Sequence, residues 1–215
     1  MNAIAATPMR RATADDVQRI ARLFADVFAH DPVFDWLVRD GDARELALQR
    51  FFGWILESRT VPYGETWITA DGLAAAAWIP PNTQEAPPRL ADDLRMLPVI
   101  LRLTGLPRLT RGAAMAAAME DAHPKVPYFY LAFIGVARGV QGTGLGSAML
   151  RATLARADAA GANAYLENSN PRNLKLYERA GFSVTREIRA RRDAPPVFAM
   201  WRPARARQGS STMSQ

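Results

Sequence analysis

The chain has 215 residues, of which 49% are hydrophobic and 22% charged, and its formal net charge is +6. This length and composition predict one soluble globular domain, large enough to bury a core without disulfides. The sequence holds no cysteine and two histidines, which excludes disulfides and a cysteine nucleophile, and we expect no metal site.

Neither a membrane nor a nucleic acid is an expected partner. The stretch MNAIAATPMRRAT lacks the apolar core of a signal peptide, and no apolar run approaches the roughly 18 residues of a membrane span, so we expect a cytoplasmic protein. Positive charge gathers late, in REIRARRDAPP and WRPARARQ. A solvated basic edge and attraction of an anionic ligand both fit this charge. Nucleic-acid binding fits less well, because aromatic residues do not alternate with the basic ones.

Helical periodicity follows a short predicted strand at residues 9–12. Thr13 precedes Asp16 by three residues, a capping-box spacing, and apolar residues recur at helical intervals until Pro32 ends the helix. A second helix is expected over residues 42–58, with four residues facing inward: Leu46, Phe51, Trp54 and Ile55.

The middle of the chain predicts a hairpin, because Asp71-Gly72 joins two apolar runs. The predicted segments are strands at 64–69 and 73–79, a proline-rich loop at 82–88, and a helix at 89–120 that is broken near Gly105 and Pro107. After them comes YFYLAFIGV, residues 128–136. It hardly alternates, which is typical of a strand buried on both faces.

The last part of the chain predicts two helices and three strands. The first helix begins near Leu145 and ends at Gly161, a C-cap position. Its two expected apolar faces are Leu145, Ala148, Met149, Ala152 and Ala155, and Leu150 with Leu154. The remaining segments are the strand NAYLEN, a helix from Asn170-Pro171 to Gly181, and a hairpin at about 182–189 and 196–202.

This order of elements indicates the fold class. Some strands follow one another directly and others flank helices, which predicts an α/β fold with a mixed, partly antiparallel sheet and argues against a doubly wound one. We expect a single domain over residues 1–203 and a disordered tail over residues 204–215.

Four glycines stand where the strongest strand meets the following helix, in VARGVQGTGLGSAML: Gly139, Gly142, Gly144 and Gly146. The first amides of a helix have no intrahelical partner, and the helix dipole places positive charge there. Glycine allows an anion to approach these amides closely. The pattern therefore predicts an anion site, with a simple tight turn as the alternative.

Two phosphate-binding motifs do not fit this loop. A Walker A loop requires lysine where Leu145 stands. The dinucleotide pattern G-x-G-x-x-G/A fails as well, because its last position falls on Ser147 when counted from Gly142 and on Met149 when counted from Gly144.

What fits is Gln141-x-x-Gly144-x-Gly146. Here the sequence resembles the GNAT family of N-acetyltransferases, whose pyrophosphate-binding signature is Gln/Arg-x-x-Gly-x-Gly/Ala. PYFYLAFIGVARGVQGTGLGSAML and AYLENSNPRNLKLYERAGFSV look like the puromycin N-acetyltransferase-like branch, as do RRATADDVQRIARLFADVFAHDP and AAAAWIPP, so most of residues 9–188 is covered. One departure is Arg138, which stands where the family often has proline.

The resemblance implies a GNAT-type, largely antiparallel mixed sheet in which two central strands splay apart, and it implies acetyl-CoA as the cofactor. The expected cofactor-binding residues are Ile134, Gly135, Val136, Gln141, Gly142, Thr143, Gly144, Leu145, Gly146, Ser147, Asn170, Asn173 and Tyr177. Gly135 marks a β-bulge or a close packing contact, and Asn170 and Asn173 contact the ligand or cap the helix.

Two residues are expected to move protons during acetyl transfer. The resemblance places the general acid at Tyr177, four residues before a Gly-Phe pair, with a packed amphipathic tyrosine as the alternative. Glu167 is the expected general base, because it lies on the strand beside the splay and is the only acid between Asp158 and Glu178. The alternatives are that Glu167 is a surface or strand-edge carboxylate, and that the amine is deprotonated through water without a dedicated base. For His123 we expect a hydrogen bond in a loop.

These expectations amount to an acetyl-CoA-dependent N-acetyltransferase that acts on a small-molecule or peptide amine by direct attack in a ternary complex. The alternative is a non-catalytic CoA-binding regulatory module. Four residues are expected near the acceptor: Asp31, Phe34, Trp36 and Trp54. Dimers are frequent in the family, so a homodimer is compatible. The resemblance does not establish drug resistance, because one fold hosts many functions.

Overall fold

The computed structural model describes residues 8–81 and 90–205, with the side chains of 90–95 left out. In this part of the chain seven strands form one sheet in the order β1-β2-β3-β4-β5-β7-β6. Every neighbouring pair is antiparallel except β4 and β5, which are parallel. The strands are β1 (Met9–Arg11), β2 (Thr66–Thr69), β3 (Ala74–Ile79), β4 (Tyr128–Val136), β5 (Asn163–Asn168), β6 (Ser183–Ile188) and β7 (Val197–Arg202).

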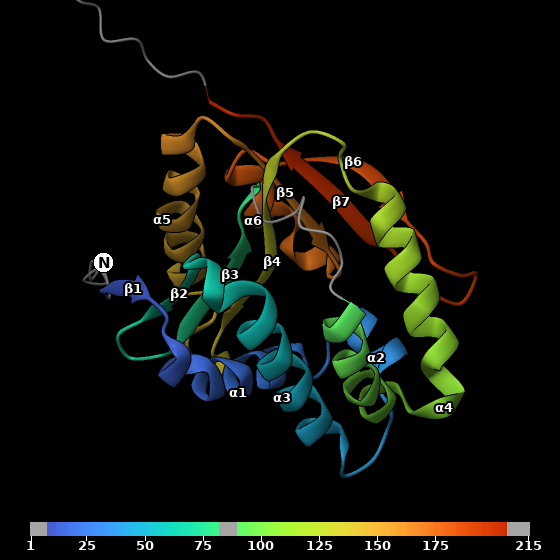
Figure 1. Ribbon diagram of the computed structural model, residues 1–215. Coiled ribbons are helices and arrows are strands. Elements are labelled where there is room, and N and C mark those ends of the chain that lie inside the picture. Colours follow the sequence, from blue (N-terminus) through green and yellow to red (C-terminus); the bar gives the residue numbers. More distant parts are fainter. Residues whose placement is uncertain (1–7, 82–89, 206–215) are drawn as a thin grey trace, which may run out of the picture.

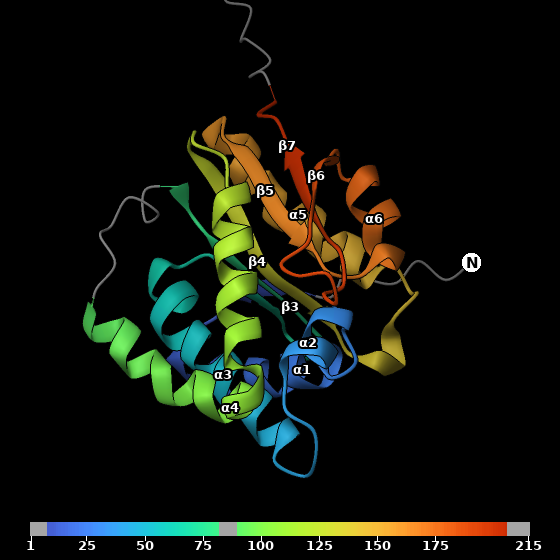
Figure 2. The same cartoon turned by 90° about the vertical axis from the view of Figure 1, so that its right-hand side faces the viewer.

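Helices cover both faces of this sheet. They are α1 (Val17–Phe28), α2 (Pro32–Leu37), α3 (Arg44–Ile55), α4 (Leu90–Ala122), α5 (Leu145–Ala160) and α6 (Leu174–Arg179). One apolar cluster packs α5 and α6 on one face, and two others pack α1 to α4 on the opposite face. Figure 1 shows α5 across the sheet from α4, and in Figure 2 α4 runs in front of the sheet while α5 lies behind it. The predicted mixed α/β class is confirmed.

The start of the chain folds as its capping residues predict. The backbone amide of Thr13 donates to Asp16 at 2.9 Å, and Arg10 holds the same carboxylate at 2.6 and 2.7 Å. The helical segment then breaks before Pro32, where the Asp31 side chain caps α2 by accepting from the amide of Val33 at 2.9 Å. This cap places Asp31 at the edge of the cavity described below.

The inward faces expected for α3 and α5 are partly wrong. Leu46 is 49% exposed, and α3 instead buries Ala47, Leu48, Phe52 and Gly53. In α5, Ala152 and Ala155 are exposed. The apolar residues of α3 lie on all sides of the helix, so its sequence periodicity does not define one buried face. The contact of α3 with α1 selects that face. Alanine is too small to define a face on α5, where larger side chains pack on the sheet: Leu145, Met149, Leu150 and Leu154.

Helix α4 changes direction at Gly105, whose φ of 66° and ψ of 166° are not helical. The predicted break is therefore confirmed. Its first part packs against α3 and its second part reaches β6. Both parts border the same cavity, because the kink lets one helix follow two sides of it.

Strands β4 and β5 separate after a short parallel pairing. Their last paired residues are Tyr130 and Tyr165, after which β4 pairs with β3 and β5 pairs with β7. The irregularity in β4 lies between Leu131 and Phe133, and Gly135 pairs regularly with Ala75. The bulge expected at Gly135 is therefore wrong.

Gly135 has a packing role instead. A Cβ at this position would lie 3.0 Å from Cδ1 of Phe24 in α1. Glycine therefore lets the helix lie directly on the strand.

Two findings concern the described part of the chain, and two predicted segments lie outside it. No helix among the described residues is long and apolar enough to cross a membrane. The same residues include no cluster of three or more histidine, aspartate or glutamate side chains that could hold a metal ion. The loop expected at 82–88, and the tail beyond Arg205, lie outside the described residues.

Candidate active site

A cavity of about 1200 Å³ opens where β4 and β5 separate. Its lining includes α5, α6 and the glycine loop (residues 138–144) on one face of the sheet, and α1 to α4 on the other. All of β4 from Tyr130 to Val136 also borders it. Pockets for one drug-sized ligand measure about 300–1,000 Å³, so this cavity has room for two ligands that meet between the strands.

The glycine loop turns sharply into the N-terminus of α5. Gly142 and Gly144 have φ values of 79° and 94°, in the left-handed region that favours glycine. A Cβ at either position would meet open space, and no described side chain caps the helix. The first amides of α5 are therefore bare and face a cavity, which is the geometry of an anion site.

The other predicted loop residues hold this turn in place. The side chain of Gln141 donates to the carbonyl of Val136 at 2.9 Å, and Thr143 donates to the carbonyl of Val140 at 2.8 Å. A Cβ on Gly146 would lie 3.3 Å from Val136, so α5 packs closely on β4. Every predicted cofactor residue lines the cavity except two: Thr143 and Leu145.

Tyr177 is a buried residue of α6 whose side chain borders the cavity. Its ring packs edge-on against Phe182, with centroids 6.2 Å apart. Burial raises the pKa of the Tyr177 hydroxyl, and the charge of nearby Asp31 raises it further. The hydroxyl therefore keeps its proton across the neutral range, as a general acid requires.

Asp31 reaches the cavity from the turn between α1 and α2. It accepts hydrogen bonds from the amides of Val33 and Phe34 at 2.9 and 3.4 Å, and from the hydroxyl of Ser169 at 2.5 Å. Burial raises the pKa of its carboxyl. The residue thus joins α2 to the segment after β5 and places a carboxyl group near Tyr177.

Glu167 also lines the cavity, and its side chain is only 2% exposed. Its Oε1 lies 2.8 Å from Nε2 of His123, and Nδ1 of that histidine lies 2.7 Å from the hydroxyl of Tyr128. The expected hydrogen bond of His123 is confirmed. Glu167 is not the surface carboxylate of the alternative interpretation.

Three tyrosines surround this pair. Burial and the charge of Glu167 raise the pKa of Tyr128 to about 12, and they also raise the pKa values of Tyr130 and Tyr165. Burial alone would lower the pKa of His123, but its hydrogen bond to Glu167 and the charge of that residue outweigh burial and raise it. The cluster therefore favours a charged His123–Glu167 pair among neutral tyrosines.

Comparison with known proteins agrees with this geometry. Residues 106–182 match the profile of the Acetyltransferase (GNAT) family. One similar crystal structure is that of histone acetyltransferase HPA2 and related acetyltransferase from Corynebacterium glutamicum, with 25% identity, a TM-score of 0.70, and coverage of 94% of this chain and 98% of that one. The chain has the GNAT acetyltransferase fold.

Two more distant neighbours share the GNAT fold. A polyamine N-acetyltransferase from Drosophila melanogaster is 15% identical, with a TM-score of 0.55 and coverage of 90% of this chain and 98% of that one. An arylalkylamine N-acetyltransferase 2 from Aedes aegypti is 11% identical, with a TM-score of 0.61 and coverage of 91% and 98%. At these identities the likeness concerns the fold alone.

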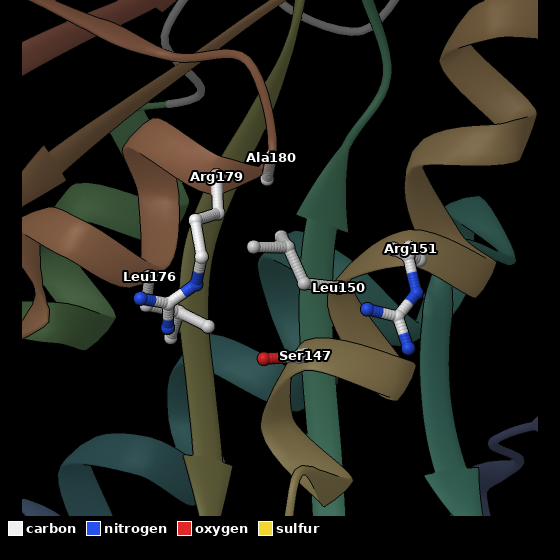
Figure 3. Close-up of a pocket in the computed structure, with 6 residues that line it drawn as sticks. All are labelled: Ser147, Leu150, Arg151, Leu176, Arg179 and Ala180. Atoms are coloured by element: carbon white, nitrogen blue, oxygen red, sulfur yellow. The ribbon is translucent and has the colours of Figure 1, made fainter.

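The structure adds two arginines that the sequence did not single out. A groove of about 320 Å³ lies between α5 and α6. Figure 3 shows Arg151 on one side of it, Arg179 on the other and Ser147 between them. Neither guanidinium forms an ion pair with a described residue. Arg151 follows Ser147 by four residues and so shares its helix face, which was the one available sequence signal.

Some of the other predicted residues line the cavity, and some make structural contacts elsewhere. Asn170 lines the cavity but also caps the turn after it, because its side chain accepts from the amide of Arg172 at 3.1 Å. Asn173 lines the cavity too. Of the four residues expected near the acceptor, Asp31 and Phe34 line the cavity. Trp36 and Trp54 do not line it, and their rings lie under the guanidinium groups of Arg111 and Arg59.

Proposed function

We propose that this protein is an acetyl-CoA-dependent N-acetyltransferase that transfers an acetyl group to a primary amine in a ternary complex. One observation carries the proposal: an uncapped helix N-terminus with bare amides opens onto a cavity that passes between two separated strands. The GNAT fold and its N-acetyltransferase neighbours support this function.

The residues present suit acetyl-CoA, which supplies an activated acetyl group as a thioester. The amides from Gly142 to Ser147 would hold its pyrophosphate, because left-handed glycines leave them open to an anion. The unpaired edge of β4 at Ile134 to Val136 would hold the pantetheine arm. Arg151 and Arg179, which form no ion pair within the described part of the chain, add two positive charges beside the helix end, which suits a further phosphate.

Tyr177 would act as the general acid. It borders the cavity, and its raised pKa keeps a proton available for the departing sulfur. Burial on α6 holds its ring in one place, which supports a fixed donor position.

Glu167 would accept the proton that the attacking amine must lose. It lies on β5 beside the gap, and the contact with His123 fixes its carboxylate. No cysteine exists for an acyl-enzyme, so direct attack by the amine is the proposed route.

Several finer statements remain predictions: the puromycin N-acetyltransferase-like branch, a cytoplasmic location, a homodimer, and a single domain over residues 1–203. The acceptor is proposed to be a small-molecule or peptide amine, since neighbours of the same fold act on a polyamine and on arylalkylamines by their descriptions. The alternative is a CoA-binding module without turnover.

Calorimetry with acetyl-CoA and a steady-state assay of CoA release with a panel of amines test the proposal. We expect saturable binding at one site and amine-dependent CoA release. Binding without release for any amine would favour the non-catalytic module. If no binding occurs, the proposed function is wrong.

A further inference from the structure

Basic and acidic side chains line different sides of the large cavity. Its arginines are Arg172 and Arg179, from the segment that ends in α6, and Arg138 of the glycine loop, which is ion-paired with Asp26 at 3.3 Å. Among the described lining residues, the acids are Asp31, which caps α2, and Glu167, which points toward the face covered by α4. A polyanionic ligand therefore suits one side, and a cation suits the other.

The acidic side has an apolar wall. Phenylalanines from three helices meet there: the ring centroids of Phe28 and Phe34 are 5.6 Å apart, and those of Phe34 and Phe51 are 5.9 Å apart. Helix α4 adds Leu103, which packs in the same apolar cluster as these rings, and Met115 and Met119, which belong to a second cluster. The packed rings form a fixed surface, and the methionines can adapt to the shape of an apolar ligand.

From this juxtaposition we propose that the acceptor is a primary monoamine, with one positive charge and an extended apolar body. This inference rests on the proposed acetyltransferase function. The ammonium group lies near Asp31 and Glu167, and the apolar body lies between the phenylalanines and α4. The carboxyl group of Asp31 attracts the amine, whereas the charge of Glu167 is offset by His123 at 2.8 Å, so Glu167 contributes less to this attraction. The apolar wall favours burial of the carbon chain.

A second charge on the acceptor is disfavoured by the same lining. In a diamine of similar length, the far ammonium would lie among phenylalanine, leucine and methionine side chains. The described residues that line this part of the cavity on α1 to α4 are mostly apolar, among them Phe28, Phe51 and Ile100. Burial of an ammonium without a partner is strongly unfavourable, so polyamines should be poor acceptors.

A matched pair of amines tests this proposal. Hexylamine and 1,5-diaminopentane have the same number of non-hydrogen atoms and differ by a methyl group in place of the second ammonium. We expect kcat/KM for hexylamine to exceed that for the diamine at least 100-fold. Along butylamine, pentylamine and hexylamine, kcat/KM should rise about three- to fourfold per methylene, since one buried methylene contributes about 0.8 kcal/mol.

A matched pair of variants locates the selectivity in this cavity. Ala116 and Ala117 are adjacent exposed residues of α4, but only Ala116 lines the cavity. Ala116→Glu supplies a carboxylate for a second ammonium, so the preference for hexylamine over the diamine should fall at least tenfold. Ala117→Glu should leave that preference within twofold of the wild type.

Calorimetry with each amine, on the free and on the CoA-loaded protein, measures the preference without turnover. Equal or tighter binding and turnover of the diamine would overturn the proposal while leaving the acetyltransferase function intact. An unchanged preference in Ala116→Glu would also overturn it. If CoA does not bind, the proposed function fails, and binding of the two amines to the free protein still decides whether this cavity selects an apolar monoamine.

Discussion

Tyr177 shows how one residue can serve the core and the cavity together. It belongs to the apolar cluster beneath α5 and α6, yet it also borders the large cavity. Burial gives the hydroxyl a raised pKa, so the environment that packs the ring also keeps the proton on its oxygen.

Tyr177→Phe should lower kcat by about 10²–10⁴-fold, the usual contribution of a general acid, and should leave the affinity for acetyl-CoA nearly unchanged. Phenylalanine keeps the ring packing and removes the proton donor. Steady-state kinetics and calorimetry measure the two effects. Tyr63→Phe, at a 39% exposed tyrosine outside the cavity, is the control. Equal losses in kcat and affinity would mean that Tyr177 is a packing or binding residue.

His123 is a second residue with a testable electrostatic role. Its pKa is raised by Glu167, so the charged pair stabilises the folded state. Because the folded pKa lies above the unfolded value of about 6.5, this stabilisation is complete below that pH and is lost as the pH rises through the folded pKa.

His123→Gln should therefore remove part of the pH dependence of stability. From about pH 6 to about pH 9, the free energy of unfolding of the wild type should fall relative to that of the variant. Urea unfolding at each pH measures the difference. Parallel curves for His123→Gln and the wild type would show that the pair does not stabilise the fold.

At the scale of elements, the glycine loop and α5 form one unit. Gly142 and Gly144 turn the chain, Gln141 and Thr143 fix the turn, and Gly146 lets the helix pack on β4. The first helical amides are held open by this arrangement.

Gly144→Ala should lower stability and CoA affinity together. A side chain at a φ of 94° costs about 1–2 kcal/mol, and a changed turn would misdirect the amides. We expect about tenfold weaker binding of CoA, the equivalent of one charge-assisted hydrogen bond. Calorimetry and thermal unfolding measure both effects. Gly139→Ala is the control, since a Cβ there meets no atom within 4 Å and its φ is not left-handed. Wild-type affinity in Gly144→Ala would contradict the anion site.

The positions of helices, strands and turns were more predictable from the sequence than the buried faces of helices or the contacts between side chains. The hairpin at Asp71-Gly72, the break at Gly105 and the end of α5 at Gly161 follow from local backbone chemistry, and the structure has all three. The buried face of α3 depends on its contact with α1, which no local pattern encodes. The His123–Glu167 contact joins residues 44 positions apart. The sequence analysis therefore singled out each residue but did not predict that they form a pair.

At the scale of the whole molecule, the cavity ties the two faces of the sheet together. Its lining comes from helices on both sides and from the edges of the separated strands. A ligand held there contacts elements that the sheet otherwise keeps apart. Binding should therefore stabilise the entire fold and not one half of it.

Thermal unfolding tests this coupling. At about 100 times its Kd, CoA should add about 2.7 kcal/mol of stability, which corresponds to a rise in Tm of about 5–11 °C for a chain of this size. The unfolding transition should remain single, as expected for one domain. Gly144→Ala, at the same CoA concentration, should show a smaller rise. Two separate transitions, with only one shifted by CoA, would show that the faces unfold independently.

The end of β4, where it has separated from β5, also divides the cavity lining into an earlier and a later part of the chain. Residues before about Ala137 contribute the part of the cavity lining that belongs to α1 to α4, and residues after it contribute the glycine loop, β5, α5 and α6. Exchange of the first part for that of a related chain would therefore replace Asp31 and the phenylalanine wall of the proposed acceptor site, while the glycine loop, Glu167 and Tyr177 would stay.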